Sequence, residues 1–341
     1  MIKHLQRILA IVISMFLFSG CTDKEEISVA TQDVFAMDTF MTLTGYGEKA
    51  DETVSAAVEE INRINSLFSV GDENSEISIL NKSGSIHASE DTVYVLKEAL
   101  SLYDSTDGAF DITIYPLMEL WGFTTGEYRV PAAEEIQSGL NYVNASKIQL
   151  DETADILSIG DGQGVDLGAI AKGYTSDRIM DIFKKYDLVS GMVSLGGNVQ
   201  CYSGKIDGTP WNCGIQDPDE PDSILCVVSV KDKAVITSGS YERFFTDKET
   251  DTTWHHIIDP STGYPADSGL SSVTIISDRG ILADGLSTSI FIMGLEQGIR
   301  YWQADSDSFD MILVTKDREI YVTEGISDSV SCDYSFHTIH S

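Results

Sequence analysis

The chain has 341 residues, of which 42% are hydrophobic, 22% charged and 9% aromatic, and its 22 Lys and Arg against 54 Asp and Glu give a formal net charge of −32. This composition excludes a disordered chain, which holds fewer aromatic and branched aliphatic residues, and a nucleic-acid binder, which needs basic patches to displace counterions. The length suits one large domain or two ordinary ones. An acidic body repels an acidic ligand unless a metal ion or local hydrogen-bond donors intervene.

The N-terminus has the pattern of a bacterial targeting segment. Lys3 and Arg7 precede an apolar segment over residues 8–18. This segment is too short to span a bilayer as a helix and suits the hydrophobic region of a signal peptide. The segment ends in Phe18-Ser19-Gly20-Cys21, which resembles the lipobox whose Cys is lipidated, although Phe18 replaces the usual Leu. The alternative is an ordinary secretory signal with an incidental Cys.

This pattern divides the chain into three parts. We expect a lipoprotein signal peptide over 1–20, a polar tether over 21–33 and a single domain over 34–341, with no clean boundary inside it. Cleavage before Cys21 removes two cations and no acids, which leaves 20 cations against 54 anions and a charge of −34. The expected location is the outer face of the cell membrane, with the lipid on Cys21 as the anchor.

Apolar periodicity gives the expected elements of the domain. Helices are predicted over 51–68, 93–103, 173–186 and 282–293. Strands are predicted over 35–47, 192–203, 225–230, 234–237, 272–276, 311–315 and 319–322. Because helices and strands are grouped rather than alternating, the pattern predicts an α+β fold of layered antiparallel sheets with packed helices.

Four cysteines follow Cys21. They form no CxxC pair, so the sequence argues against a zinc site. Outside the cytoplasm a disulfide is possible, but spacing alone assigns none, and we expect mostly small buried side chains. The four are Cys201, Cys213, Cys226 and Cys332.

Asp284 and Thr288 stand four residues apart on a predicted helix. This spacing places a carboxylate and a hydroxyl on one face, and such hard oxygen ligands suit Mg²⁺. The alternative is an ordinary capping or surface pair.

The segment Val165-Asp166-Leu167-Gly168-Ala169-Ile170-Ala171-Lys172-Gly173-Tyr174 places small residues where we expect a strand to turn into a helix. Backbone amides and carbonyls exposed at such a junction can hold a phosphate or a metal, with Asp166 and Lys172 fixing the polar groups of the ligand. The alternative is a tight turn with solvated charges.

Other segments carry weaker signals. The turn Leu195-Gly196-Gly197-Asn198 can bring backbone close to a ligand, but is more often a bulge or hairpin feature. Thr237-Ser238-Gly239-Ser240-Tyr241-Glu242-Arg243 is dense in donors, and His255 and His256 precede a Pro/Gly turn. Adjacent histidines point apart and make a poor metal pair, but one can act as a base or a hydrogen-bond donor.

In this order, the motifs resemble the ApbE family, the FAD:protein FMN transferases, from about residue 34 to about residue 325. The motifs are Ala36-Met37-Asp38-Thr39, Asn74-Ser75-Glu76-Ile77-Ser78, Asp107-Gly108-Ala109-Phe110-Asp111, residues 165–174 and 194–198, Thr237-Ser238-Gly239 with Tyr241-Glu242-Arg243, His256-Ile257-Ile258-Asp259-Pro260 with Thr262-Gly263, and Ala283-Asp284-Gly285-Leu286-Ser287-Thr288.

The resemblance implies an ApbE- or T-fold-like architecture and an enzyme that binds FAD and Mg²⁺, moves FMN onto a Thr hydroxyl of a partner protein, and releases AMP. The implied partners are subunits of Na⁺-translocating NADH:quinone reductase or Rnf-type complexes. The implied metal ligands are the Asp284 and Thr288 side chains and the Ala169 carbonyl, and the implied catalytic residues are Asp284 and His256. The residues implied to contact FAD are Met37, Ala109, Phe110, Asp111, Asp166, Lys172, His256 and Ile258.

One position departs from the family pattern. Many members carry a Tyr shortly before the Asn74-Ser75-Glu76 motif, where this chain has Gly71. A more open diphosphate predicts some hydrolysis of FAD to FMN and AMP without a partner. Two alternatives to transfer therefore stay open: a Mg²⁺-dependent FAD pyrophosphatase, and a lipoprotein that binds flavin without chemistry.

Overall fold

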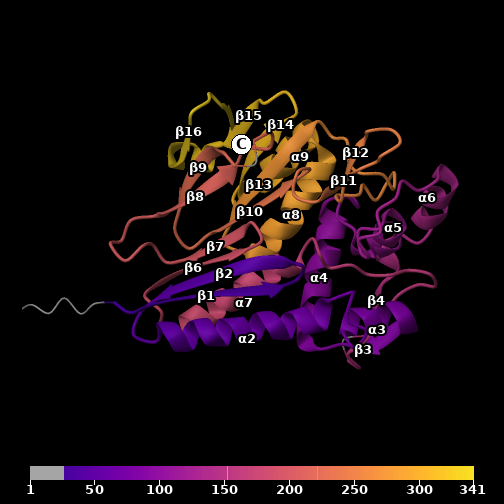
Figure 1. The fold of residues 1–341 in the computed structure, drawn as a ribbon, viewed down its shortest axis with the longest axis horizontal. Coiled ribbons are helices and arrows are strands. Elements are labelled where there is room, and N and C mark those ends of the chain that lie inside the picture. The colour runs from indigo at the N-terminus through magenta and orange to yellow at the C-terminus, as the bar shows by residue number, and fades with distance from the viewer. Residues whose placement is uncertain (1–26, 152, 221) are drawn as a thin grey trace, which may run out of the picture.

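The computed structural model describes residues 27–151, 153–220 and 222–341. A nine-stranded sheet runs through the molecule in the order β1-β2-β6-β7-β10-β13-β14-β15-β17 (Figure 1). Neighbouring strands are antiparallel except β15 and β17, which pair in parallel. The strands are β1 (Val29–Ala36), β2 (Thr39–Tyr46), β6 (Ser190–Leu195), β7 (Asn198–Tyr202), β10 (Ala234–Gly239), β13 (Leu270–Ser277), β14 (Asp310–Thr315), β15 (Ile320–Thr323) and β17 (His337–Ile339).

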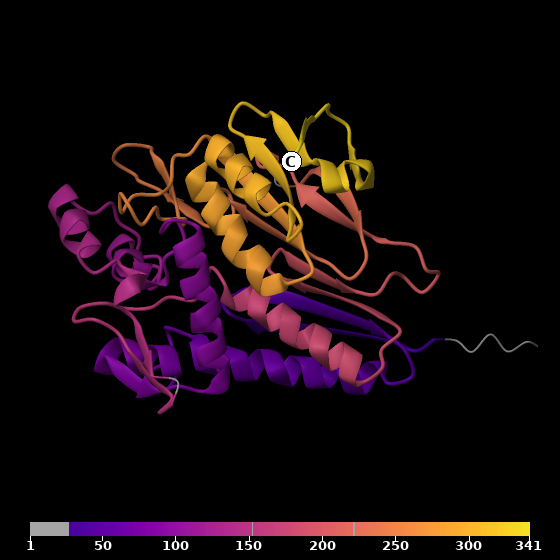
Figure 2. The ribbon, with the colours of Figure 1, turned by 180° about the vertical axis from the view of Figure 1, so that it is seen from behind.

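Helices cover one face of this sheet, and a second sheet covers part of the other. Figure 2 shows the four main covering helices together on one face, which are α2 (Ala50–Phe68), α7 (Ala171–Lys185), α8 (Gly280–Met293) and α9 (Leu295–Ala304). The second sheet has the order β16-β9-β8 and shares a buried cluster with β7, β10, β13, β14 and β15. Its strands are β8 (Trp211–Gln216), β9 (Ile224–Val230) and β16 (Val330–Cys332).

A smaller group of elements lies at one end of these layers. It comprises α3 (Glu76–Ser83), α4 (Glu90–Ser105), α5 (Tyr115–Trp121), α6 (Ala133–Leu140), a three-stranded sheet of β3 (Ser85–His87), β5 (Ile156–Ser158) and β4 (Gln149–Asp151), and a hairpin of β11 (Phe244–Thr246) and β12 (Thr253–His255). The group is joined to the layers because α4 packs against α8. The α+β layered fold is therefore confirmed.

Two segments predicted as single strands are hairpins. The segment 35–47 contains a turn at Met37 and Asp38, whose φ values of 49° and 58° reverse the chain between β1 and β2. The segment 192–203 is broken by Gly196 and Gly197, with φ values of 60° and 94°, between β6 and β7. The glycine pair indicates the second turn, whereas the first is formed by two residues with side chains and has no glycine to mark it.

The first strand also shortens the predicted tether. Val29 to Asp33 pair with β2, so these residues belong to the sheet rather than to a tether over 21–33. The predicted signal peptide over 1–20 and the predicted lipidation of Cys21 lie outside the described residues.

One disulfide joins strands far apart in the sequence. Cys226 on β9 and Cys332 on β16 are paired across the three-stranded sheet and bonded, at a sequence separation of 106. Cys201 and Cys213 are buried free thiols whose sulfurs lie 3.9 Å apart. The expectation of small buried cysteines therefore holds for the second pair, and the first pair adds a covalent link to the C-terminal region.

We expect this disulfide to stabilise the domain, because a bond that closes a long loop restricts the unfolded chain. A reductant should lower the free energy of unfolding by about 2–4 kcal/mol, read from urea melts. The Cys226→Ser/Cys332→Ser variant should have the lowered value with and without reductant, whereas Cys201→Ala/Cys213→Ala should keep its response. A wild-type midpoint that does not move on reduction would contradict the assignment.

Candidate functional site

The crossing of α7 and α8 holds two carboxylates, one buried and one partly buried, that exchange helix caps. Asp284 on α8 accepts the N–H of Gly173 in the first turn of α7 at 2.7 Å. Asp177 on α7 accepts the N–H groups of Gly280 and Ile281, at the start of α8, at 2.6 Å and 2.9 Å. Each helix N-terminus therefore receives a negative group from the other helix, where unpaired N–H groups and the macrodipole favour it.

Glycines permit this close approach. A Cβ on Gly173 would lie 2.3 Å from the Gly280 carbonyl oxygen and 2.6 Å from the Asp284 Cβ. A Cβ on Gly280 would lie 2.4 Å from the Ser176 Oγ. These distances are all too short for non-bonded atoms. Any larger residue at Gly173 would therefore displace α8 together with Asp284.

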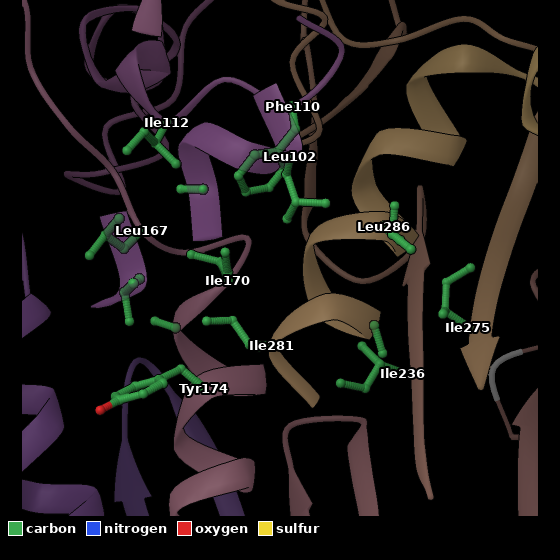
Figure 3. Packing of buried hydrophobic residues seen from close by; sticks show 14 of the residues in the cluster. Leu102, Phe110, Ile112, Leu167, Ile170, Tyr174, Ile236, Ile275, Ile281 and Leu286 are labelled. Carbon is green, nitrogen blue, oxygen red and sulfur yellow. The ribbon is translucent and has the colours of Figure 1, made fainter. Parts of the chain in front are cut away.

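The loop before α7 differs from the expected strand-to-helix junction. The preceding strand β5 ends at Ser158, and residues 159–170 form a loop. Buried side chains anchor this loop in the core. Figure 3 shows Leu167 and Ile170 of the loop in one cluster with Leu102, Phe110 and Leu286. The apolar packing therefore fixes Ala169 and Lys172 relative to α8.

Asn198 gives Asp284 a second partner. Its side-chain Nδ2 donates to Asp284 Oδ1 at 2.9 Å, and both residues are almost fully buried. The turn at Gly196 and Gly197 places Asn198 there at the start of β7. We did not select Asn198 as a site residue from the sequence, although it lies in one of the quoted motifs.

The hydroxyl predicted beside Asp284 lies in a small polar network. Thr288 Oγ1 is 3.3 Å from the Ser238 Oγ, and Ser238 Oγ is also 2.8 Å from the Ser287 Oγ. Ser287 in turn donates to the Asp284 backbone carbonyl at 2.8 Å. The end of β10 therefore presents Ser238 to the same face of α8 that carries Thr288.

These oxygens have the chemistry that Mg²⁺ requires. Each Asp284 carboxylate oxygen accepts one hydrogen bond and keeps a lone pair for a cation. The Thr288 hydroxyl and the Ala169 carbonyl are oxygens of the type that Mg²⁺ prefers, and their role as ligands stays a prediction. Within the described ranges, no three His, Cys, Asp or Glu side chains gather in a metal-ligating group. A set with one carboxylate depends on a backbone carbonyl, water and ligand phosphates, which is the usual environment of Mg²⁺.

Charged side chains from three segments surround this crossing. Glu242, just beyond β10, is water-accessible, yet desolvation raises its pKa to about 7, with Asp284 adding to the rise and Lys172 opposing it. Burial likewise raises the pKa of Asp166, opposed by the Gly168 N–H at 2.7 Å and by the charges of Arg243 and Lys172. Titratable groups with pKa values shifted in this way are frequent at functional sites.

His256 is held beside Arg243. Its Nδ1 lies 3.1 Å from the Arg243 carbonyl oxygen, which can only accept, so the neutral ring carries its proton on Nδ1 and leaves Nε2 as an acceptor. Desolvation, reinforced by the cations Arg243 and Lys172, lowers the pKa of His256 to about 3. The ring is therefore neutral throughout the physiological range. Arg243 itself donates to the Phe123 carbonyl and lies over the Phe123 ring.

Some of the residues predicted to contact flavin lie near the helix crossing, and others lie in the core. Met37 lies at the hairpin turn, where its N–H donates to Asn65 at 2.9 Å and its sulfur is 3.8 Å from the Thr175 Oγ1 of α7. Phe110 and Ile258 are buried in the packing of the domain, and Ala109 lies half-buried beside Phe110.

Asp111 has a structural role that the sequence did not reveal. One oxygen accepts the Thr113 N–H at 2.7 Å and its hydroxyl at 2.6 Å, and the other accepts the Ala145 N–H at 3.1 Å. It thereby caps the short helix Ile112–Ile114 and ties this helix to the segment at Ala145. Its predicted contact with FAD stays a prediction, made by a carboxylate that already has three donors.

A polar crevice lies near Asp166. It lies between the end of α3, Tyr115 and the glycine-rich loop Gly160-Asp161-Gly162-Gln163-Gly164. Burial raises the pKa of Tyr115 to about 12, and the charges of Glu119 and Asp166 contribute to the rise, which places the crevice within electrostatic reach of Asp166. The same loop continues from the crevice to Asp166 and then to the start of α7.

The fold and the site define a layered α+β protein with a cluster of carboxylate, hydroxyl and amide groups at the crossing of two helices. The ApbE family model matches residues 37–313, and the chain belongs to the ApbE family. An FAD:protein FMN transferase of Klebsiella pneumoniae is 32% identical over 279 residues, covering 80% of this chain and 85% of that protein. An FAD:protein FMN transferase of Treponema pallidum is 29% identical over 335 residues, covering 91% of each.

Two solved structures share the fold. The ApbE protein of Thermotoga maritima superimposes with a TM-score of 0.83 at 32% identity, covering 89% of this chain and 99% of that one. The flavin transferase ApbE of Vibrio cholerae superimposes with a TM-score of 0.78 at 27% identity, covering 89% and 99%. The family resemblance inferred from the motifs is therefore confirmed.

Proposed function

We propose that this protein is an FAD:protein FMN transferase that moves FMN from FAD to a threonine hydroxyl of a partner protein. The threonine oxygen forms a bond to the FMN phosphorus, the bond to the AMP phosphate breaks, and the threonine proton goes to a base. Relatives matched along nearly their whole length carry this enzyme name. The single observation that best supports the proposal is Asp284, buried and aimed by Gly173 and Asn198 at the start of α7.

The chain's own residues supply the positioning that phosphoryl transfer requires. When bound to Asp284, Thr288 and the Ala169 carbonyl, Mg²⁺ would neutralise diphosphate charge and support the departure of AMP. Lys172 adds a cation at the same place, and Asp166, Met37 and the backbone of the loop 165–170 would fix the rest of FAD. These cations and hydrogen-bond donors would offset the electrostatic repulsion between the acidic protein and the acidic diphosphate of FAD.

The direct test is one reaction. The mature protein is incubated with FAD, Mg²⁺ and a recombinant acceptor subunit of the Na⁺-translocating NADH:quinone reductase or Rnf type, and the acceptor is read by in-gel flavin fluorescence. We expect a fluorescent band that disappears with EDTA and when the acceptor threonine is replaced by valine. A protein that binds flavin but never labels the acceptor or releases AMP would support the non-catalytic alternative.

His256 is our candidate for the group that accepts the threonine proton, at Nε2. Because its pKa is about 3, the imidazole stays able to accept a proton far below the range of an ordinary histidine. We therefore expect the transfer rate at saturating substrates to show no decline as the pH falls from 7.5 to 6, and His256→Ala to lose most activity at every pH. A decline centred near 7 that Glu242→Gln abolishes would assign the proton to Glu242, whose pKa is about 7 and which must be ionised to act as a base.

Hydrolysis of FAD is the competing reaction, and Gly71 offers a way to vary it. This exposed position has no positive φ, and a Cβ there would meet only the Ser69 Oγ, at 3.7 Å, so a side chain fits. We expect Mg²⁺-dependent AMP release from FAD alone in the wild type, and slower release in Gly71→Tyr, with Gly71→Ala unchanged. Absence of AMP release by the wild type without an acceptor would contradict this expectation.

We also propose attachment to the outer face of the cell membrane by a lipid on Cys21. Among residues 27–151, 153–220 and 222–341, no helix is long and apolar enough to cross a bilayer. Support comes from the lipobox-like sequence and from a polar stretch before β1 that separates the anchor from the domain. A Cys21→Ser variant released from the membrane fraction into the soluble fraction would be the expected result.

A further inference from the structure

Two large aromatic side chains are exposed together at the tip of the first hairpin. Phe35 on β1 and Phe40 on β2 are 60% and 78% exposed, and their rings are in edge contact with centroids 5.0 Å apart. They are directly opposite each other in the hairpin register. An exposed aromatic pair of this size is costly to leave in water and is typical of a surface that a partner covers.

The pair flanks the hairpin turn that contacts the elements of the candidate site. Met37 and Asp38 form the turn between the two rings, and Met37 contacts α7 through Thr175. On the other side of the turn, Thr39 packs on the backbone at Gly196, where a Cβ would come within 2.3 Å of the Thr39 Oγ1. Two residues beyond Gly196, Asn198 donates to Asp284, so a short chain of contacts joins the pair to the proposed metal ligand.

The face that carries the two rings is open. Met41 and Leu43 point to the opposite face, where they are buried with α2. The middle of the open face is polar: Thr31 and Thr44 form one cross-strand hydrogen bond, and Thr42 donates to Asp33 at 2.6 Å. At the far end of the hairpin, Tyr46 lies near Trp211. The aromatic pair is therefore a local apolar site at the turn end of the hairpin.

We propose that Phe35 and Phe40 form the docking surface for the acceptor protein, and that they contact an apolar side chain near the acceptor threonine. This inference rests on the proposed transferase function, which requires a protein to approach the candidate site closely enough for its threonine to reach FAD. An apolar contact suits this chain, because its net charge of −32 attracts few protein surfaces by charge unless they are basic. Six residues of β1, Val29 to Val34, lie between the pair and the start of that strand.

The test compares two surface variants with the same acceptor subunit used for transfer. Phe35→Ser/Phe40→Ser removes the pair, and Ile224→Ser is the matched control, since Ile224 is 64% exposed on β9 of the other sheet. We expect the double variant to raise the acceptor KM about tenfold, as for loss of an interface hot spot, while kcat, the FAD KM and the thermal unfolding temperature stay at wild-type values. The control should leave all four quantities unchanged.

The outcomes separate the two proposals. If the wild type labels no acceptor, the transferase function fails and the docking surface has no partner to serve. If the wild type labels the acceptor and the double variant keeps the wild-type acceptor KM, the docking proposal alone is overturned. A rise in the FAD KM instead would place the pair in the flavin site, and loss of binding to anionic lipid vesicles with an unchanged acceptor KM would make it a membrane contact. Either result also overturns the docking proposal.

Discussion

Replacing Asp284 with alanine is expected to abolish Mg²⁺-dependent AMP release from FAD, with or without an acceptor. The substitution removes the only carboxylate of the proposed metal site and leaves the Gly173 N–H and the Asn198 amide without their shared acceptor. Loss of several kcal/mol of charge stabilisation corresponds to a rate decrease of about a thousandfold or more. The measurement is AMP release against Mg²⁺ concentration, together with Mg²⁺ binding by calorimetry in the presence of FAD.

The chain offers a closely matched control. Asp177 is a partly buried carboxylate at the same helix crossing and also accepts backbone N–H groups at a helix start. Asp284→Asn and Asp177→Asn each remove one charge and one acceptor oxygen, so both should destabilise the fold by about 1–3 kcal/mol. Only Asp284→Asn should lose Mg²⁺ dependence. Wild-type AMP release by an Asp284 variant would exclude the metal assignment, and equal loss in both variants would reduce Asp284 to a structural cap.

Four helices (α2, α4, α7 and α8) and the strands β1, β2, β6, β7, β9, β10, β13, β14 and β15 coincide with predicted segments, because each depends on local spacing, whereas α3, α5, α6 and α9 were not predicted. The helical period places Asp284 and Thr288 on one face regardless of what lies opposite. The two hairpin turns were less visible: the glycines at 196 and 197 indicate a turn, but Met37 and Asp38 adopt positive φ without a glycine. Tertiary contacts, rather than sequence preference, hold that turn, as the Met37 bond to Asn65 shows.

The contacts that bring the residues of the candidate site together could not be predicted from the sequence. Nothing in the spacing of Gly173, Asn198 and Asp284 shows that they meet, because they belong to α7, β7 and α8. The same holds for the exchange of caps with Asp177, which no motif contains. Asp111 illustrates the opposite difficulty: its place in a family motif suggested a ligand contact, whereas its burial and three donors show a capping role that a motif cannot express.

The glycine at 173 should be as sensitive as the metal ligand. In Gly173→Ala the added Cβ meets the Gly280 carbonyl oxygen at 2.3 Å and the Asp284 Cβ at 2.6 Å, and no side-chain rotation relieves contacts with backbone atoms. The helices must separate, which breaks the 2.7 Å bond from the Gly173 N–H to Asp284. Overpacking of this kind costs about 1–3 kcal/mol of folding free energy.

We expect the loss of activity to exceed what this destabilisation explains. A shift of Asp284 by about 1 Å is enough to lower the rate about a hundredfold in a reaction that depends on positioning, even at temperatures where the variant is fully folded. The assay is Mg²⁺-dependent AMP release at 15 °C with folding monitored by circular dichroism, and the control is Lys184→Ala, an exposed position in the last turn of the same helix. A folded Gly173→Ala protein with wild-type turnover would mean that the crossing of α7 and α8 tolerates separation, and that Asp284 is not held in place by Gly173.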